Sequence, residues 1–416
     1  MRADASPDAA GASASGAGAV TGTAGAPAAG PGDAHAGTGV YLHVPFCLRR
    51  CHYCDFNTYA DRDELIPRYA GALRADIARV LEAGPAALAP AGAAGPARWP
   101  EITSIFVGGG TPTLLPPGDL AAVIADLRSA LPVARDAEIT VEANPETVTI
   151  EHMSVLVAAG INRVSIGAQS FVPSVLAALG RWHELEAPLR AVDASRRAGV
   201  ERLSLDLIYG TPGESDADWR HSVQTALGTG VDHLSAYALT VEPNTEYARR
   251  VRLGTAQAPD DDVQADRMEQ VDTLAAAHGL QRYELSNWAG PGRQSVHNRT
   301  YWRDGDWLAF GAGAHGHWRG RRWWSVRSPE RYVALALDGR STTAGDEVPD
   351  PAQRRAERMM MGLRLVEGVP RRAVAPLDET TVRHLVTAGL LAADDERIAL
   401  TSAGMRLASA VTLRLL

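Results

Sequence analysis

The sequence predicts an α/β protein built from parallel βαβ units, followed by a smaller helical unit. From Val40 onward, apolar strand patterns alternate with helical patterns, which is typical of parallel βαβ units. Residues 341–416 instead show helical patterns with one short strand pattern at 397–401. A length of 416 residues leaves room for one large domain and a smaller one.

The first 38 residues consist mainly of alanine, glycine, serine and proline. This composition cannot bury enough apolar surface to offset the entropy of ordering, so we expect residues 1–38 to be disordered. The segment lacks the charged start and apolar core of a secretory signal, and Asp4, Asp8 and Asp33 argue against a transit peptide. The sequence does not indicate whether this tail belongs to the mature protein.

Six strands are predicted after the tail. Their ranges are Val40–Val44, Ile102–Val107, Glu138–Glu142, Arg163–Gly167, Arg202–Leu207 and His233–Leu239. Between the first two, apolar residues from Leu65 to Val80 recur at helical spacing, as expected of a crossover helix, and residues 83–98 form a loop rich in alanine, glycine and proline. Loops after the carboxyl ends of such strands build the site of a barrel.

All three cysteines of the chain, Cys47, Cys51 and Cys54, lie in one CxxxCxxC run directly after the first predicted strand. A disulfide framework would need an even number of cysteines spread along the chain, whereas clustered thiolates can converge on a soft metal centre. A cubane of four irons held by three thiolates keeps one iron open for a small-molecule ligand. The spacing therefore favours an iron-sulfur cluster.

Two alternatives remain open for this loop. Cys51 and Cys54 form a CxxC that is compatible with a redox pair, although that motif does not account for the third cysteine. A zinc site could instead be completed by His43, His52 or Asp55. Structural zinc sites usually draw their ligands from two separated pairs, which favours iron-sulfur over zinc.

The cysteine loop and its surroundings resemble the radical S-adenosylmethionine (SAM) superfamily. Tyr53 precedes the last cysteine, and the run Gly108–Thr113 follows the strand-like residues 104–107, at the place of the glycine motif that receives the methionine end of SAM. Glycine suits that place because a residue without Cβ lets a ligand approach the backbone. The resemblance implies a [4Fe-4S] cluster whose open iron binds SAM.

Later segments resemble one branch of the superfamily, the coproporphyrinogen dehydrogenases and haem chaperones of the HemN/HemW group. These segments are 141–146, 163–171, 179–183 and 204–213, and the similarity runs from about Val40 to near the C-terminus. It implies a partial (β/α)6 barrel at 39–240, a barrel extension at 241–340 and a winged-helix-like domain at 341–416, after the tail at 1–38. Carried over residue by residue, the resemblance assigns SAM contacts to Tyr41, Gly109, Gly110, Thr111, Glu142, Gln169, Arg181, Asp206 and Ala238. A forked guanidinium such as that of Arg181 suits a carboxylate, and a carboxylate such as Asp206 can accept hydrogen bonds from ribose hydroxyls.

The second informative region begins at His297, Tyr301 and Trp302, in the sequence HNxxYW, and continues through an unusual density of histidine and aromatic residues to Trp324. Aromatic faces can stack on a flat macrocycle and an imidazole can ligate its iron. From the residues alone, a packed β-ribbon with a small tryptophan core is the stronger interpretation, because aromatic residues pack more often than they bind. The resemblance associates HNxxYW with haem and makes His297 the first candidate ligand, with Tyr301 and Trp302 beside it.

The same region contains GxGxxG at residues 311–316. A dinucleotide fingerprint needs a strand before it and a helix after it, and the residues that follow have no helical period. We therefore assign no nicotinamide or flavin site.

One position separates the two activities of the resembled branch. Coproporphyrinogen dehydrogenases carry a fourth cysteine where this chain has Phe56. The resemblance thus implies a chaperone that transfers haem to apo-haemoproteins, membrane respiratory enzymes among them. The alternative is an oxygen-independent coproporphyrinogen III dehydrogenase that uses the 5′-deoxyadenosyl radical. His52 departs from the usual proline and could alter the cluster potential or offer an extra metal site.

Charge and hydropathy exclude other classes of partner. The net charge is −8, which argues against nucleic acid as the main partner, and the C-terminal domain is not notably basic. No apolar run is long enough to span a bilayer. Reduced thiols in an exposed loop predict a cytoplasmic protein, and the oligomeric state stays open, with a homodimer as one alternative.

Overall fold

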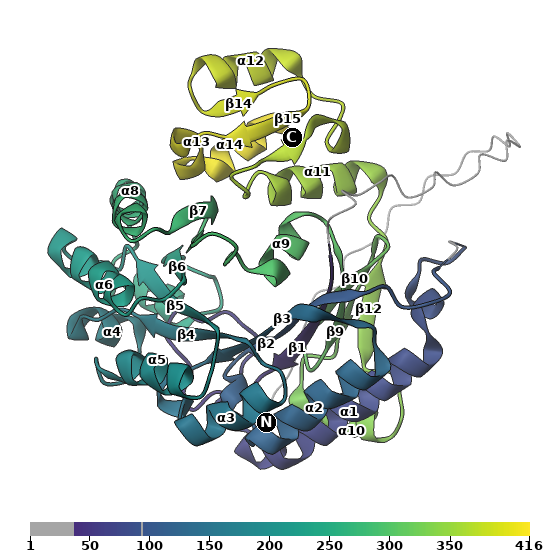
Figure 1. The fold of residues 1–416 in the computed structure, drawn as a ribbon. Coiled ribbons are helices and arrows are strands. Elements are labelled where there is room, and N and C mark those ends of the chain that lie inside the picture. Colours follow the sequence, from purple (N-terminus) through teal and green to yellow (C-terminus); the bar gives the residue numbers. More distant parts are fainter. Residues whose placement is uncertain (1–36, 93–94) are drawn as a thin grey trace, which may run out of the picture. The chain divides into compact units, whose positions relative to one another are not determined.

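The computed structural model describes residues 37–92 and 95–416, so the disorder expected for the N-terminal tail lies outside the described residues except at positions 37 and 38. The six predicted strands are present and lie side by side in chain order, each parallel to the next (Figure 1). They are β1 (Thr38–Val44), β2 (Ile102–Gly109), β3 (Val133–Ala143), β4 (Arg163–Gln169), β5 (Arg202–Tyr209) and β6 (His233–Ala238). This confirms the predicted partial (β/α)6 barrel, with β3 starting five residues earlier than the sequence pattern indicates.

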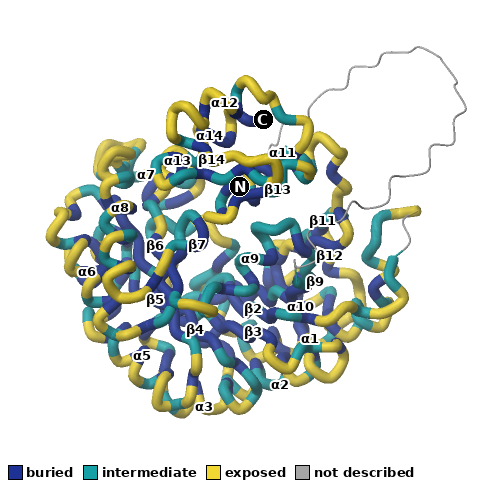
Figure 2. The backbone as a smooth tube through the Cα atoms, turned by 45° about the horizontal axis from the view of Figure 1, so that its top comes forward, coloured by how far each residue is buried: buried dark blue, intermediate teal, exposed yellow. Residues whose placement is uncertain are grey.

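Helices cover the outer side of this curved sheet (Figure 1). They are α1 (Ile66–Ala83), α2 (Pro117–Ala130), α3 (Ile150–Ala158), α4 (Pro173–Leu179), α5 (Ala187–Arg197) and α6 (Asp216–Gly228). In α1, Tyr69, Leu73 and Ile77 are buried at the spacing read from the sequence, and Gly84 ends the helix with a positive φ of 80°. Figure 2 shows the strands buried and the outer faces of the helices exposed.

The sheet continues past the first and last barrel strands, β1 and β6. It has twelve strands in the order β12-β11-β10-β9-β1-β2-β3-β4-β5-β6-β8-β7. Its further members are β7 (Gln281–Glu284), β8 (Asn287–Ala289), β9 (Asp306–Phe310), β10 (His315–Trp318), β11 (Arg321–Ser325) and β12 (Thr343–Glu347). Strand β9 pairs in parallel with β1, whereas β10, β11 and β12 pair antiparallel. The sheet is therefore open and mixed, and β9 brings the aromatic region beside the strand that leads into the cysteine loop.

The four helices of this extension are α7 (Glu246–Arg252), α8 (Asp261–Ala277), α9 (Val296–Trp302) and α10 (Pro329–Leu337). The HNxxYW motif forms α9, a short helix that the sequence patterns did not reveal. The segment 311–314 leads from strand β9 into strand β10 and not into a helix, as predicted for the GxGxxG sequence. Trp318 and Trp323 are buried in the core, so part of the tryptophan-rich segment does pack as a β-ribbon.

The C-terminal unit begins at α11 (Pro351–Gly362). It continues with β13 (Val369–Pro370), α12 (Glu379–Thr387), β14 (Leu391–Ala393), β15 (Arg397–Leu400), α13 (Ser402–Arg406) and α14 (Ala408–Leu415), and its strands pair antiparallel in the order β13-β15-β14. Residues 343–347, which the sequence places in this unit, instead form β12 of the large sheet because they pair with β11. Within the part of the chain that the structure describes, no helix has the length and hydropathy needed to cross a membrane.

Candidate iron-sulfur and SAM site

The three cysteines lie in the loop that follows β1, at the carboxyl end of the barrel strands. The loop closes on itself through Cys47 N, which donates to Tyr59 O at 3.0 Å, and Tyr59 N, which donates to Pro45 O at 2.7 Å. All three thiols are partly buried and unpaired by disulfides. They line one cavity of about 420 Å³ together with the glycine run.

His52 holds this loop to two helices. Its backbone N donates to Leu179 O at 3.1 Å and its carbonyl accepts from Tyr247 N at 2.8 Å. In the side chain, Nδ1 donates to Ala178 O at 3.2 Å and Nε2 accepts from the Arg250 guanidinium at 3.2 Å. His52 therefore fixes the cysteine loop to α4 and α7. Both of its ring nitrogens are hydrogen-bonded, so neither is free to bind a metal.

The zinc alternative loses its two histidine ligands in this geometry. His43 Nε2 donates to Asn57 O at 3.0 Å, so its Nδ1 accepts from the Tyr41 hydroxyl at 2.9 Å. Both ring nitrogens of His52 are likewise hydrogen-bonded. Among residues 37–92 and 95–416, no group of three or more His, Cys, Asp or Glu side chains surrounds a single metal position. Three thiols in one cavity wall match the three-thiolate ligand set of a [4Fe-4S] cluster.

Hydrogen-bond donors accompany the sulfurs. Arg181 Nη1 lies 3.5 Å from Cys51 Sγ, and Thr111 Oγ1 lies 3.9 Å from Cys47 Sγ. Burial raises the pKa of the Cys47 thiol to about 11, so a bound metal must displace its proton. Donors placed on coordinating sulfurs tune a cluster, and this donor set fits a [4Fe-4S] centre.

The glycine run passes close under the cysteine loop. Gly109 has a φ of 114°, and a Cβ there would come within 2.6 Å of the His43 ring. A Cβ on Gly110 would come within 2.5 Å of Phe46 O. Because Thr111 N also donates to Phe46 O at 2.7 Å, the run and the cysteine loop are one packed unit.

The structure brings the sequence-predicted SAM residues together around the same cavity, with one exception. Its walls include Gly109, Gly110, Thr111, Glu142, Gln169, Arg181, Asp206 and Ala238. Tyr41 lies in the wall of a neighbouring cavity, with which this one shares Phe56, Gly109 and Glu142. Gln169 has a φ of 64°, a left-handed conformation that is uncommon for a residue other than glycine and is often found at functional sites.

The two carboxylates of the site are held by different partners. Glu142 accepts a hydrogen bond from Gly109 N at 2.9 Å, and Asp206 accepts from Ser165 Oγ at 3.0 Å. Burial raises the pKa of Glu142 to about 7, and the neighbouring Asp206 adds to the shift while the Gly109 amide opposes it. Burial likewise raises the pKa of Asp206. Each carboxylate would gain from a ligand that brings positive charge or hydroxyl donors.

The guanidinium of Arg181 is held in place by acceptors of the protein itself. Its guanidinium donates to Gly167 O at 2.7 Å and to Asn144 Oδ1 at 3.2 Å. Its Nε is buried and, among the described residues, has no hydrogen-bond partner. Asn144 and Ser165 were missed as site residues by sequence reasoning. Asn144 follows a predicted strand by two residues, whereas Ser165 lies in the middle of one and reaches the site because its strand pairs with β3, opposite Glu142.

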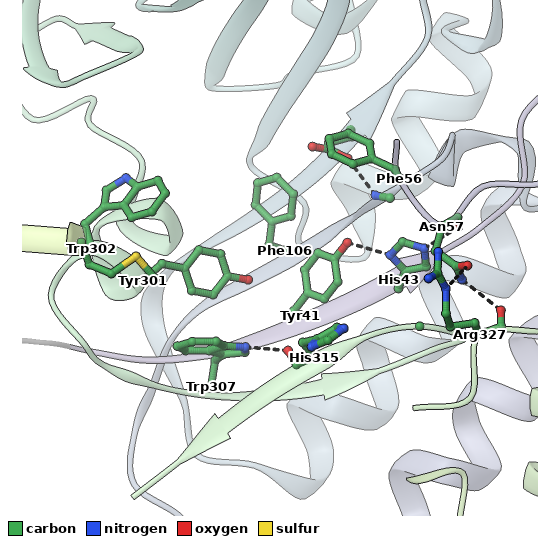
Figure 3. Close-up of a pocket in the computed structure, with 14 residues that line it drawn as sticks. Tyr41, His43, Phe56, Asn57, Phe106, Tyr301, Trp302, Trp307, His315 and Arg327 are labelled. Carbon is green, nitrogen blue, oxygen red and sulfur yellow. Dashed lines mark hydrogen bonds between the residues drawn. The ribbon is translucent and has the colours of Figure 1, made fainter. Parts of the chain in front are cut away.

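The neighbouring cavity, of about 630 Å³, is lined mainly by aromatic side chains and is called the aromatic cavity below (Figure 3). Its walls include Tyr41, His43, Phe56, Phe106, Tyr301, Trp302, Trp307, His315, Arg327 and Met361. The rings of Phe106 and Tyr41 are nearly parallel, with centroids 6.3 Å apart. Tyr301 and Trp302, predicted beside haem, are thus part of its wall.

His297, the predicted haem ligand, lies behind that wall. Its side chain is fully buried, with Nδ1 2.8 Å from Ser104 Oγ and Nε2 2.7 Å from the Tyr301 hydroxyl. Burial, with a smaller effect of the Arg163 charge, lowers the pKa of His297 to about 3, so the ring is neutral. In this conformation His297 positions Tyr301 and has no free nitrogen.

The chain matches the Radical SAM superfamily over residues 41–226 and the HemN C-terminal domain over residues 350–407. With the cysteine loop at the mouth of a partial barrel, these matches define a radical SAM protein, a class that implies a [4Fe-4S] cluster and SAM. The relative named "Heme chaperone HemW" of Mycobacterium tuberculosis is 44% identical over 384 residues, 91% of this chain and 94% of the relative. Its Bacillus subtilis counterpart is 32% identical over 380 residues, 89% and 97% of the two chains. The chain belongs to the HemW family.

The fold is also that of a solved enzyme. Coproporphyrinogen III oxidase (HemN) from Escherichia coli, a radical SAM enzyme, superimposes with a TM-score of 0.75 over 91% of this chain and 90% of HemN. The two sequences are 20% identical, so this likeness shows the shared fold alone, and the activity must be argued from the residues of the site.

Proposed function

We propose that this protein is a haem chaperone, which binds haem and hands it to apo-haemoproteins while carrying a SAM-binding [4Fe-4S] cluster. The observation that carries the proposal is the pair of adjoining cavities. One is lined by three thiols and the SAM residues, and the other is aromatic and large enough for a cofactor-sized ligand, because such cavities measure about 300–1,000 Å³. The names of the relatives support haem as the occupant of the second.

In the first cavity, Cys47, Cys51 and Cys54 would hold the cluster. When bound, such a cluster supplies an open iron for SAM and an electron for reductive chemistry. Around it, Glu142 offers a carboxylate for the methionine ammonium, Arg181 offers its Nε–H for the carboxylate, and Asp206 offers acceptors for ribose hydroxyls. Tyr41 would act indirectly, because its hydroxyl bonds the His43 ring and that ring packs on Gly109.

Phe56 favours the chaperone over the coproporphyrinogen III dehydrogenase. It stands where the dehydrogenase branch has a cysteine, it is 62% exposed, and it lines both cavities. An apolar ring there supplies a surface for a flat macrocycle and no further thiol. The recipient would be an apo-haemoprotein, with membrane respiratory enzymes among the candidates, and we place the transfer in the cytoplasm.

The proposal is tested with anaerobically reconstituted protein and with a variant in which the three cysteines are replaced by serine. The wild type should contain iron and sulfide, bind haem saturably in a Soret titration and pass it to an apo-haemoprotein. The variant should lose iron and sulfide. Zinc in place of iron, or a wild type that binds no haem, would overturn the proposal, and vinyl-bearing product from coproporphyrinogen III with SAM and reductant would establish the enzyme instead.

A further inference from the structure

Two histidines, His43 and His315, line the aromatic cavity. An iron ligand needs a free imidazole nitrogen, and both nitrogens of His43 are bonded, to Tyr41 and to Asn57 O. His297 does not line the cavity, and its Nε2 is bonded to the hydroxyl of Tyr301, which does. Ligation by His297 would require breaking that hydrogen bond and moving Tyr301 aside.

His315 meets the requirement without rearrangement. It is the first residue of β10 and is exposed, and its backbone carbonyl accepts from Trp307 Nε1 at 2.8 Å. Its ring stacks on Trp324 at 5.9 Å between centroids, with 27° between the planes, which limits its rotation. In the described part of the chain, neither ring nitrogen of His315 has a hydrogen-bond partner (Figure 3).

We propose that His315 is the axial ligand of the haem iron in the aromatic cavity, and that His297 positions the cavity wall. This inference rests on the proposed function and names the ligand of that same site. Haem iron takes a neutral imidazole, and partial burial, together with the charges of Arg327 and Arg322, lowers the pKa of His315, so the ring is neutral at physiological pH.

The surroundings of His315 also suit the macrocycle. Trp307 lies beside it, and Phe106 and Tyr41 supply flat apolar faces in the same cavity (Figure 3). Arg327 reaches the cavity with a guanidinium that bonds only an amide oxygen, Asn57 Oδ1 at 3.3 Å, and no carboxylate of the described residues. A haem propionate would give that cation its counter-charge.

The test is a titration of the reconstituted full chain with ferric haem, followed by resonance Raman of the reduced complex for the iron–histidine stretch. His315→Ala should raise Kd by about tenfold or more and abolish the stretch, and free imidazole should restore it. His297→Ala should keep the stretch. His221→Ala, an exposed histidine of α6 away from both cavities, is the matched control and should behave as wild type.

The other outcomes of the titration separate the ligand assignment from the proposed function. An unchanged stretch in His315→Ala overturns this inference while leaving the chaperone intact, and loss of the stretch in His297→Ala alone would make His297 the ligand. Absence of haem binding in the wild type would instead defeat the proposed function. Arg327→Leu should weaken haem but not haem dimethyl ester, which carries no propionate charge, and equal weakening of both would remove the role of Arg327.

Discussion

Glu142 illustrates how a site residue can reduce the stability of the fold that carries it. The carboxyl group lies in the wall shared by both cavities, and burial raises its pKa to about 7. Between about pH 4.5 and 7 the folded protein keeps a proton that the unfolded chain has lost, so the free energy of unfolding falls as pH rises through this window. Above pH 7 the folded protein holds an ionised, partly desolvated carboxylate.

Glu142→Gln should therefore stabilise the SAM-free protein at pH 8 and have little effect near pH 4.5. The gain is expected to be on the order of 1–2 kcal/mol, since contact with water in the cavity reduces the full effect of the pKa shift. Urea unfolding at pH 5 and pH 8 measures it. Glu146→Gln, at an exposed position four residues on, is the control, and an equal gain at both pH values for Glu142→Gln would contradict the explanation.

Gly109 allows a second prediction at the residue scale. Its φ of 114° and the 2.6 Å approach of a would-be Cβ to the His43 ring leave no room for a side chain. Gly109→Ala should destabilise the protein by about 1–3 kcal/mol and weaken SAM binding, measured by urea unfolding and equilibrium dialysis. Gly118→Ala in α2, where a Cβ meets nothing within 4 Å, should instead be neutral or stabilising.

At the scale of elements, the six barrel strands were predictable because each shows a short strand pattern and helical patterns separate them. Strand β9 and helix α9 were not. The pairing of β9 with β1 joins residues more than 260 positions apart, and no local pattern encodes such a contact. In the same way, the cysteine and glycine motifs revealed the site, but the hydrogen bonds that occupy His297 depend on Ser104 of β2, which nothing in HNxxYW indicates.

Helix α9 is held at its N-terminus by Glu138 of β3. This carboxylate is buried, accepts from Ser295 Oγ and His297 N at 3.2 Å each, and has Arg202 within 3.6 Å. Glu138→Ala should cost about 3–5 kcal/mol of unfolding free energy, because it leaves buried cations and donors without a partner. Asp193→Ala, which breaks an exposed pair with Arg197, should cost at most about 1 kcal/mol, and similar losses in both variants would contradict the role given to Glu138.

At the scale of the whole molecule, the cavity that contains the three cysteines draws its walls from β2 to β6 and from the cysteine loop, so a ligand there would bridge most of the barrel. SAM at about 100 times its Kd should therefore raise the free energy of unfolding of the reconstituted protein by about 2.7 kcal/mol. Thermal unfolding with and without SAM measures this. Asp206→Asn should show a clearly smaller shift at the same SAM concentration, and a full shift would remove Asp206 from the site.

Phe56, Gly109 and Glu142 belong to both cavities, so a ligand in one cavity contacts residues that also form the wall of the other. Any factor by which SAM changes the affinity for haem must equal the factor by which haem changes the affinity for SAM. A recipient that withdraws haem would then alter how tightly SAM is held, and the SAM supply would in turn set how readily haem is released. In the proposed chaperone, the shared wall would link the delivery of haem to the binding of SAM.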